Sequence, residues 1–292
     1  MTFDDSTVRA LTEIANRYGT PAYAFDVRSL RGQVELLEER LPSDVVVYYS
    51  LKANASLGIC QVFANCDIGA DVASTGELAT AKAAGFDDEK IFVAGPYKMP
   101  ETIAMLHEAP AAIVSVDSLS ELETLSDAGL TNRAVLRLRP DFGSCAVVQA
   151  GSESRFGFTS DDFARCRDRL PSCGLDVIGF HVFAGSQVLN TEELCGHLRR
   201  SMDLALRAAD ALRVTPTLIN LGGGFGIPYG PAESEFDLAA VSAQLDELLQ
   251  LAKPAGIMLE LGRYLVAKSG YYLTSVAGHQ TFQGRPAVIG PH

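Results

Sequence analysis

Short apolar runs alternate along the chain with longer stretches whose apolar residues recur at the 3.6-residue spacing of a helix. Eight runs have the length and composition of buried strands: 45–49, 67–70, 90–94, 112–116, 134–138, 175–181, 217–221 and 257–260. The intervening amphipathic or Ala-rich stretches include 74–84, 118–128, 191–212 and 236–252. A strand followed by a helix, repeated in this way, predicts an α/β fold whose parallel strands close into a (β/α)8 barrel of the TIM type.

Two of the predicted helices begin with the sequence of a capping box. Ser74 stands three residues before Glu77, and Ser118 stands three residues before Glu121. In that motif the serine side chain accepts a hydrogen bond from the backbone N–H of the glutamate, and the glutamate side chain accepts one from the backbone N–H of the serine. Both motifs therefore mark helix starts soon after a predicted strand.

The two ends of the chain do not fit inside a barrel. Residues 27–263 hold the eight buried strand-like runs and are assigned to the barrel. Residues 1–26 are expected to form a helix near 7–18 and a strand at 21–25, and 264–292 to form further strands, the last at 286–289. We expect these flanks to belong to a second, β-containing domain that is incomplete in this chain.

Charge and hydropathy narrow the classes of partner. The chain has 24 Lys and Arg against 36 Asp and Glu, a net charge of −12, which repels a phosphate backbone and argues against a nucleic-acid partner. The first residues are acidic where a signal peptide is basic, and no apolar run reaches the roughly 18 residues of a membrane span. We expect a cytoplasmic protein with no membrane partner.

Cysteines are scattered without a Cys-x-x-Cys pair: Cys60, Cys66, Cys145, Cys166, Cys173 and Cys195. A chain of this size is stabilised by its core, so reduced thiols are expected, with neither disulfides nor a metal site.

Polar residues and glycines stand at the C-terminal ends of the predicted strands, where the active site of such a barrel forms. The candidates are Lys52, Asp71, Arg137, His181, Ser186, Gly222, Gly223, Gly224, Glu260 and Arg263. We expect them to meet at one mouth of the barrel.

Lys52 follows a strand interpreted as fully buried. An ammonium group there is partly desolvated, which favours the neutral amine that Schiff-base chemistry needs. A solvated loop lysine is the alternative.

The glycine turn after the seventh strand, Gly222 to Gly224, has no Cβ atoms and lets backbone N–H groups approach an anion such as phosphate. A tight strand-to-helix turn explains the same glycines.

The other candidates also have two interpretations. His181 ends an otherwise apolar strand and is either a core residue or a ring that stacks on a ligand. Glu260 and Arg263 form a structural ion pair, or a carboxylate for a protonated ring nitrogen beside a guanidinium for phosphate. Together, a lysine, an anion-binding turn, a carboxylate and an imidazole meet the requirements of pyridoxal phosphate (PLP).

Six motifs carry a resemblance to a known family: 48–54, 69–78, 154–157, 181–187, 222–225 and 260–263. In order and spacing they resemble the PLP-dependent ornithine/diaminopimelate/arginine decarboxylases, which have an alanine-racemase-like barrel. The resemblance implies that Lys52 would carry PLP as an aldimine, His181 would stack on the pyridine ring and Glu260 would pair with its nitrogen. Ser186, Gly222 to Gly224 and Arg263 would hold the phosphate, and Asp71, Glu77 and Arg137 would surround the site.

Three features depart from the family pattern. The stretch 181–187 is longer than usual and, with 94–98, resembles the branch that acts on carrier-linked or otherwise unusual amino acids. Leu261 replaces a proline, a mild change. Family members continue into a β-domain that supplies site groups across a homodimer interface. We therefore expect this chain to bind PLP weakly with little or no turnover, and a form extended beyond His292 to dimerise and decarboxylate.

The resemblance implies an amino-acid decarboxylase that acts on a diaminopimelate-like, ornithine-like or carrier-linked substrate. Two alternatives stay open. A racemase of the same fold typically places an arginine at the ring nitrogen, so Glu260 argues against it. A non-catalytic PLP-binding or regulatory protein is the second. Tyr229, Glu233 and Glu235, after the glycine turn, are candidates for contact with the distal end of the substrate.

Overall fold

The computed structural model describes residues 4–142, 148–149, 155–276, 278–282 and 285–289. Its centre is a closed barrel of parallel strands, ordered β10-β11-β2-β3-β4-β5-β6-β8. The strands are β2 (Val45–Ser50), β3 (Gly69–Val72), β4 (Ile91–Val93), β5 (Ile113–Val116), β6 (Arg133–Leu138), β8 (Asp176–Val182), β10 (Leu218–Asn220) and β11 (Gly256–Leu261). Each overlaps one predicted run, and the predicted TIM-type barrel is confirmed.

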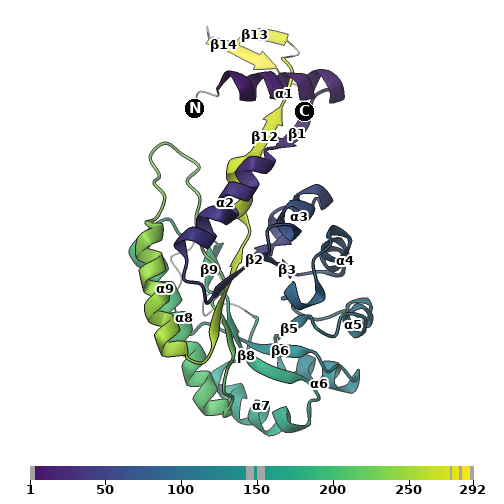
Figure 1. Ribbon diagram of the computed structural model, residues 1–292, viewed down its shortest axis with the longest axis vertical. Coiled ribbons are helices and arrows are strands. Elements are labelled where there is room, and N and C mark those ends of the chain that lie inside the picture. The colour runs from purple at the N-terminus through teal and green to yellow at the C-terminus, as the bar shows by residue number, and fades with distance from the viewer. Residues whose placement is uncertain (1–3, 143–147, 150–154, 277, 283–284, 290–292) are drawn as a thin grey trace.

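Helices surround the barrel on the outside (Figure 1). They are α2 (Val27–Arg40), α3 (Leu57–Ala64), α4 (Thr75–Ala84), α5 (Pro100–His107), α6 (Leu119–Asp127), α7 (Phe163–Arg169), α8 (Thr191–Leu212) and α9 (Leu238–Ala252). Ser74 and Ser118 cap α4 and α6 as predicted, each accepting a hydrogen bond from the glutamate amide three residues on. The glutamate side chains, however, accept the amides of Ala73 and Asp117, one residue before each serine.

Alternation along the strands separates two cores and directs the functional residues inward. On β11, Ile257, Leu259 and Leu261 face the helices in the larger core, whereas Met258 packs in a smaller core inside the barrel. Glu260 lies two residues from Met258 and therefore also points inward. The inner core fills the barrel with Tyr48, Phe92, Ile113, Val135 and Met258. The site consequently rests on a packed floor.

The two flanks meet outside the barrel. Strand β1 (Ala22–Phe25) pairs antiparallel with β12 (Gly270–Leu273), so that Ala22 lies opposite Leu273. Helix α1 (Asp5–Tyr18) and the antiparallel strands β13 (Gly278–Phe282) and β14 (Arg285–Ile289) lie at the end of the molecule beyond this pair (Figure 1).

The prediction of strand from residue 264 onward is wrong for its first part. Residues 263–269 form the short helix α10 (Arg263–Val266) and a 3-10 turn, Ala267–Ser269. Tyr264 packs edge-on against Phe225, with ring centres 5.4 Å apart, and also contacts Phe236. Three consecutive buried residues, 264–266, cannot all face one side of a strand. Tertiary packing therefore overrides the β propensity of Tyr and Val.

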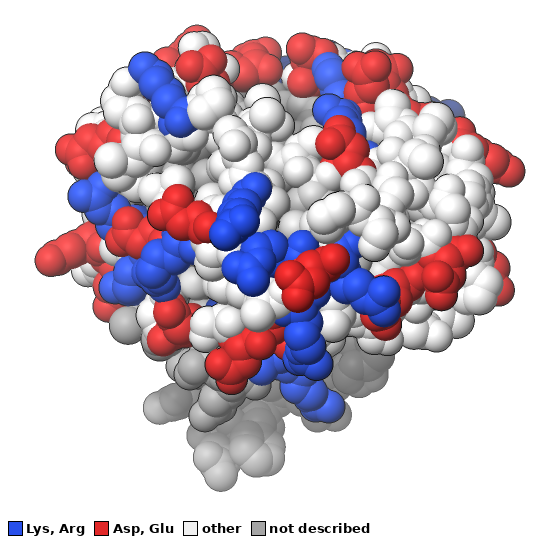
Figure 2. Space-filling view, turned by 90° about the horizontal axis from the view of Figure 1, so that it is seen from below, with Lys and Arg blue, Asp and Glu red and all other residues white. Residues whose placement is uncertain are grey.

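Charged residues of both signs are interspersed on the face seen in Figure 2. Arg169 on α7 forms an exposed ion pair of 2.6 Å with Glu123 on α6. Among the residues with described positions, no helix has the length and apolar character needed to cross a membrane. The five cysteines that the structure describes have free thiols, and Cys145 lies outside the described residues.

Candidate active site

Lys52 lies in a 3-10 turn, Leu51–Ala53, directly after β2. Its side chain is exposed, and its Nζ atom lies 5.0 Å from the centre of the Phe183 ring. Its exposure matches the alternative of a solvated loop lysine and not the expected partial desolvation, because the chain leaves the strand at Ser50 and carries Lys52 above the packed interior. An accessible amine at the mouth of the barrel remains suited to reaction with a carbonyl group.

Two carboxylates are buried near this lysine. Ser50 Oγ donates a hydrogen bond of 2.5 Å to Asp71 Oδ2, from the end of β2 to β3. Burial raises the pKa of Asp71, while the positive charges of Lys52 and Arg137 oppose that rise. Burial also raises the pKa of Glu260 to about 7; the charge of Asp71 adds to the increase and Lys52 counteracts it. The sequence placed Asp71 after its strand, but it lies within β3.

His181, on β8, lies between two polar partners. Its Nδ1 atom is 2.9 Å from Ser115 Oγ on β5, and its Nε2 atom is 3.2 Å from Glu260 Oε1 on β11. The edge of its ring meets Phe92, 5.4 Å away between centres. Burial lowers the pKa of His181 well below its ordinary value, and the nearby charge of Arg137 lowers it further. The ring is thus a neutral imidazole at physiological pH.

Asn220 links the buried glutamate to the glycine turn. Its Nδ2 atom donates to Glu260 Oε1 at 2.7 Å, and its Oδ1 atom accepts the Gly222 amide at 2.8 Å. Sequence reasoning missed this residue, although an amide side chain at the end of an apolar strand was a usable signal. Asn220 orients the carboxylate and the first residue of the turn at the same time.

The glycine turn lies directly against β11, which explains part of its sequence. A Cβ atom on Gly223 would come within 2.0 Å of the Glu260 carbonyl oxygen, and Gly222 and Gly224 have φ angles of +69° and +86°. The tight-turn interpretation is therefore correct for these positions. It does not exclude an anion site at the amides of Gly223 and Gly224, which carry no side chain to cover them, although the Gly222 amide is bonded to Asn220.

The phosphate-site candidates lie beside one another. The Val188 amide donates to the Gly224 carbonyl at 2.8 Å, which brings the segment after Ser186 against the turn. Arg263 Nη1 donates to Gln187 Oε1 at 3.3 Å. Ser186 itself lies in β9 (Gly185–Ser186), which pairs with β7 (Val148–Gln149). These groups offer the hydroxyl, amide and guanidinium donors that bind phosphate.

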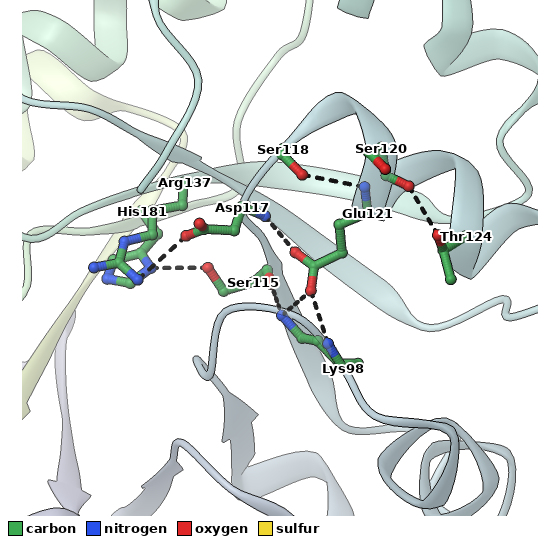
Figure 3. Close-up of polar contacts among 9 residues, drawn as sticks. All are labelled: Lys98, Ser115, Asp117, Ser118, Ser120, Glu121, Thr124, Arg137 and His181. Atoms are coloured by element: carbon green, nitrogen blue, oxygen red, sulfur yellow. Dashed lines mark hydrogen bonds and ion pairs between the residues drawn. The ribbon is translucent and has the colours of Figure 1, made fainter. Parts of the chain in front are cut away.

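Arg137 lies on β6, directly opposite His181 in the strand register. Its Nη1 atom is 3.2 Å from Asp117 Oδ1, and its guanidinium lies 5.4 Å from the centre of the Phe156 ring. Figure 3 shows Arg137 and His181 side by side, with Asp117 and Ser115 directed toward them. Of the motif at 154–157, Ser154 lies outside the described residues.

Three other candidates, Glu77, Glu233 and Glu235, bind neighbouring groups of the chain itself. Glu77 accepts the Ala73 amide and so serves the start of α4. Glu233 accepts the Tyr229 amide at 2.6 Å, and Glu235 pairs with Lys268 at 2.5 Å.

The residues present fit PLP. Within the part of the chain that the structure describes, the buried atoms Asp71 Oδ1 and His181 Nε2 have no hydrogen-bond partner. A buried carboxylate close to a second one favours a ligand that brings a positive charge or a proton. A protonated pyridine nitrogen at Glu260, an aldehyde at Lys52 and a phosphate beside Arg263 match the chemistry of the three parts of the site.

Comparison with known proteins agrees with this arrangement. The family model for the pyridoxal binding domain of pyridoxal-dependent decarboxylases matches residues 27–267. L-glutamyl-[BtrI acyl-carrier protein] decarboxylase of Niallia circulans is 30% identical, over 99% of this chain and 70% of its own length. The diaminopimelate decarboxylase of Methanothermobacter thermautotrophicus is also 30% identical, over 96% of this chain and 71% of its own.

Solved structures show the same fold. The crystal structure of diaminopimelate decarboxylase from Helicobacter pylori, complexed with L-lysine, aligns with a TM-score of 0.85 at 25% identity. The alignment covers 96% of this chain and 72% of that one.

Proposed function

This chain belongs to the pyridoxal-dependent decarboxylases, and we propose that Lys52, His181 and Glu260 carry out its reaction, the release of an amino-acid carboxylate as CO2 with PLP as cofactor. One observation supports these assignments above the others. A buried carboxylate, Glu260, lies 3.2 Å from a buried neutral imidazole, His181, within a barrel whose mouth carries an accessible lysine.

Glu260 is assigned to the ring nitrogen of the cofactor. PLP, when bound, accepts the electron pair that remains after CO2 departs, and a positive charge on its ring nitrogen strengthens that capacity. Asn220 holds Glu260 Oε1 at 2.7 Å, so the carboxylate is oriented before any ligand arrives. Such preorganised charge is most effective in a buried site.

Lys52 is assigned to the aldehyde, and a separate group of residues to the phosphate. Lys52 would hold the cofactor covalently and, once the substrate amine replaces it, would be free to hold or move a proton at Nζ. Ser186, Arg263 and the backbone of 222–224 would bind the phosphate. His181 would contact the ring face, and Asp71 and Arg137 would surround the site with opposing charges.

A racemase of the same fold is the less favoured alternative. Racemases of this barrel typically place an arginine at the ring nitrogen, which weakens the ring as an electron acceptor. Glu260, which we assign to the ring nitrogen, is a carboxylate near the end of the last barrel strand and supports a decarboxylase over a racemase.

The proposed substrate is an amino acid of the diaminopimelate or ornithine type, or an aminoacyl group linked to a carrier protein. Both relatives reported above carry names of these kinds, at equal identity. The long segment 181–187 supports the carrier-linked alternative.

A screen of CO2 release over diaminopimelate, ornithine, lysine, arginine and carrier-bound glutamate tests the function. In the form that decarboxylates, we expect release from at least one member in the presence of PLP, and none after Lys52→Ala. Equal release from both forms would refute the assignment of Lys52.

We further propose that the enzyme works in the cytoplasm as a homodimer, with 1–26 and 264–292 contributing to a second domain. The β1–β12 pairing supports this, because it joins the two flanks outside the barrel. Exposed tyrosines, Tyr23 and Tyr272, lie on that pair with ring centres 5.0 Å apart. Sedimentation tests the assembly: a dimer is expected for the form that decarboxylates, and an active monomer would contradict the proposal.

A further inference from the structure

Gln187 is a buried residue that directly follows β9, next to Ser186. Its φ angle is +67°, a left-handed conformation that is uncommon for a residue with a long side chain. Such conformations persist where the surrounding contacts determine them, and they are frequent at functional sites. The next residue, Val188, donates its amide to the Gly224 carbonyl at 2.8 Å and accepts the Gly226 amide at 3.0 Å. The backbone beside Gln187 is thus held against the chain that leaves the glycine turn.

The side chain of Gln187 forms two hydrogen bonds with the backbone of a single residue, Ile227. Its Nε2 atom donates to the Ile227 carbonyl, and its Oε1 atom accepts the Ile227 amide at 3.2 Å. A backbone carbonyl only accepts and a backbone amide only donates, so the two bonds determine which end of the side-chain amide is oxygen. Both residues are buried, and water does not replace these bonds.

The same oxygen of Gln187 binds the arginine assigned to the phosphate. Arg263 Nη1 donates to Gln187 Oε1 at 3.3 Å. A guanidinium has five N–H donors, of which this contact occupies one. Within the described part of the chain, Arg263 forms no ion pair, so no carboxylate competes for the remaining donors. Gln187 therefore orients a cation without neutralising its charge, which an acidic residue in its place would do.

Gln187 also joins the three groups that are proposed for the phosphate. Ser186 precedes it in sequence, Val188 bonds the turn at Gly224, and its own side chain bonds Arg263. These groups follow three different barrel strands, β8, β10 and β11. An arginine that is oriented before an anion arrives loses less side-chain entropy when it binds that anion.

We propose that Gln187 is a positioning residue, which is fixed by the Ile227 backbone and holds the Arg263 guanidinium ready for the phosphate of the cofactor. The inference rests on the proposed function, because it takes from there the assignment of Arg263 to the phosphate. A residue at 187 without a polar side chain would leave the Arg263 guanidinium free to rotate.

The first measurement needs no ligand. It follows the exchange of the Arg263 guanidinium protons with water in cofactor-free protein labelled with 15N-arginine, and Arg263→Lys identifies the signal. We expect slower exchange for Arg263 than for Arg9, an exposed arginine on α1. Gln187→Met should accelerate the exchange by roughly two- to tenfold, the factor that corresponds to one ordinary hydrogen bond. Gln250→Met is the matched control, because Gln250 also accepts a hydrogen bond from a cation, Lys253, but at the exposed surface of α9.

The second measurement compares the binding of PLP and of pyridoxal by absorbance titration. Gln187→Met should raise the PLP dissociation constant by roughly two- to tenfold and should change that of pyridoxal little, since pyridoxal has no phosphate. In an Arg263→Met background, Gln187→Met should have little further effect on the PLP constant, because it acts through Arg263. Gln250→Met should leave both constants unchanged.

Unchanged exchange of the Arg263 protons in the folded Gln187→Met variant would overturn the proposal, as would equal weakening of PLP and pyridoxal. A full additional loss in the Arg263→Met background would also overturn it. If Gln187→Met does not fold, Gln187→Asn is measured in the same way, since asparagine tolerates the left-handed conformation but is one methylene shorter. If the chain binds neither ligand, the proposed cofactor site fails, whereas the exchange measurement still decides whether Gln187 holds Arg263.

Discussion

His181 Nε2 lies 3.2 Å from Glu260 Oε1, the distance of an ion pair, yet the electrostatics of the site oppose an ion pair between them. Burial lowers the pKa of His181 and raises that of Glu260 to about 7, so each group shifts toward its neutral form. The two side chains therefore form a polar contact that is sensitive to any added charge. A cationic ring nitrogen is such a charge, and it would favour the carboxylate form of Glu260.

Glu260→Gln should reduce decarboxylation much more than it reduces PLP binding. The carboxylate stabilises charge that matters mainly in the transition state, so we expect kcat to fall by about 10²- to 10³-fold. The PLP dissociation constant, measured by cofactor absorbance, should change far less. Glu247→Gln, on α9 away from the barrel mouth, is the control. Equal losses in binding and turnover would point to a purely structural glutamate.

The stability of the cofactor-free protein should fall as pH rises from about 4.5 to about 7. The raised pKa of Glu260 means that the folded state retains a proton that the unfolded state has released in this range. This contribution is complete below the ordinary value of 4.5 and is lost as pH passes the folded value. Its magnitude is on the order of 3 kcal/mol.

Urea denaturation of wild type and Glu260→Gln across this range measures the effect. The wild type should lose more free energy of unfolding with rising pH than the variant does. Parallel curves would show that Glu260 has an ordinary pKa in the folded chain.

Gly223→Ala should destabilise the protein, because the new Cβ atom would lie 2.0 Å from a backbone oxygen of β11 that cannot move independently. Overpacking of this kind costs about 1–3 kcal/mol. Gly230→Ala is the matched control, since no atom lies within 4 Å of the position its Cβ would take. Thermal denaturation compares the two. Similar melting temperatures would mean that the glycine turn is not held tightly against β11.

Arg263→Met should weaken binding of PLP but not of pyridoxal, which lacks the phosphate. A charge-assisted hydrogen bond contributes about 1.5–3 kcal/mol, so the PLP dissociation constant should rise by roughly 10- to 100-fold. Arg207→Met, which removes an exposed ion pair with Asp141, controls for loss of charge. Binding is followed by absorbance titration. If both ligands are weakened equally, Arg263 acts through Gln187 and not on the phosphate.

The barrel was predictable from sequence because its strands are continuous apolar runs and its helices repeat at a regular spacing. The rim residues were predictable for the same reason, since a strand end is visible in the pattern. Two single polar residues within apolar strands were missed, because part of what each does depends on a partner remote in sequence: Glu260 for Asn220 and His181 for Ser115. The Lys98–Glu121 pair joins the loop after β4 to the first turn of α6, and no local pattern signals it.

The errors at Lys52 and Tyr264 have a common physical origin. Both residues follow the end of a barrel strand, where the direction of the chain depends on what it packs against and not on its own propensity. The Lys52 side chain lies above Phe183, and Tyr264 turns inward against Phe225 and Phe236. The exposure of Lys52 and the burial of Tyr264 therefore follow from tertiary contacts.

The attachment point of PLP tests the central claim most directly. The chain is incubated with PLP, reduced with borohydride and mapped by peptide mass spectrometry, with Lys98 as the internal comparison because it is also on a loop at the C-terminal end of a barrel strand. We predict a pyridoxyl adduct on Lys52 and none on Lys98, whose ammonium group is buried and bonded to Glu121 and Ser115. An adduct on Lys98, or an unmodified Lys52, would contradict the proposed site.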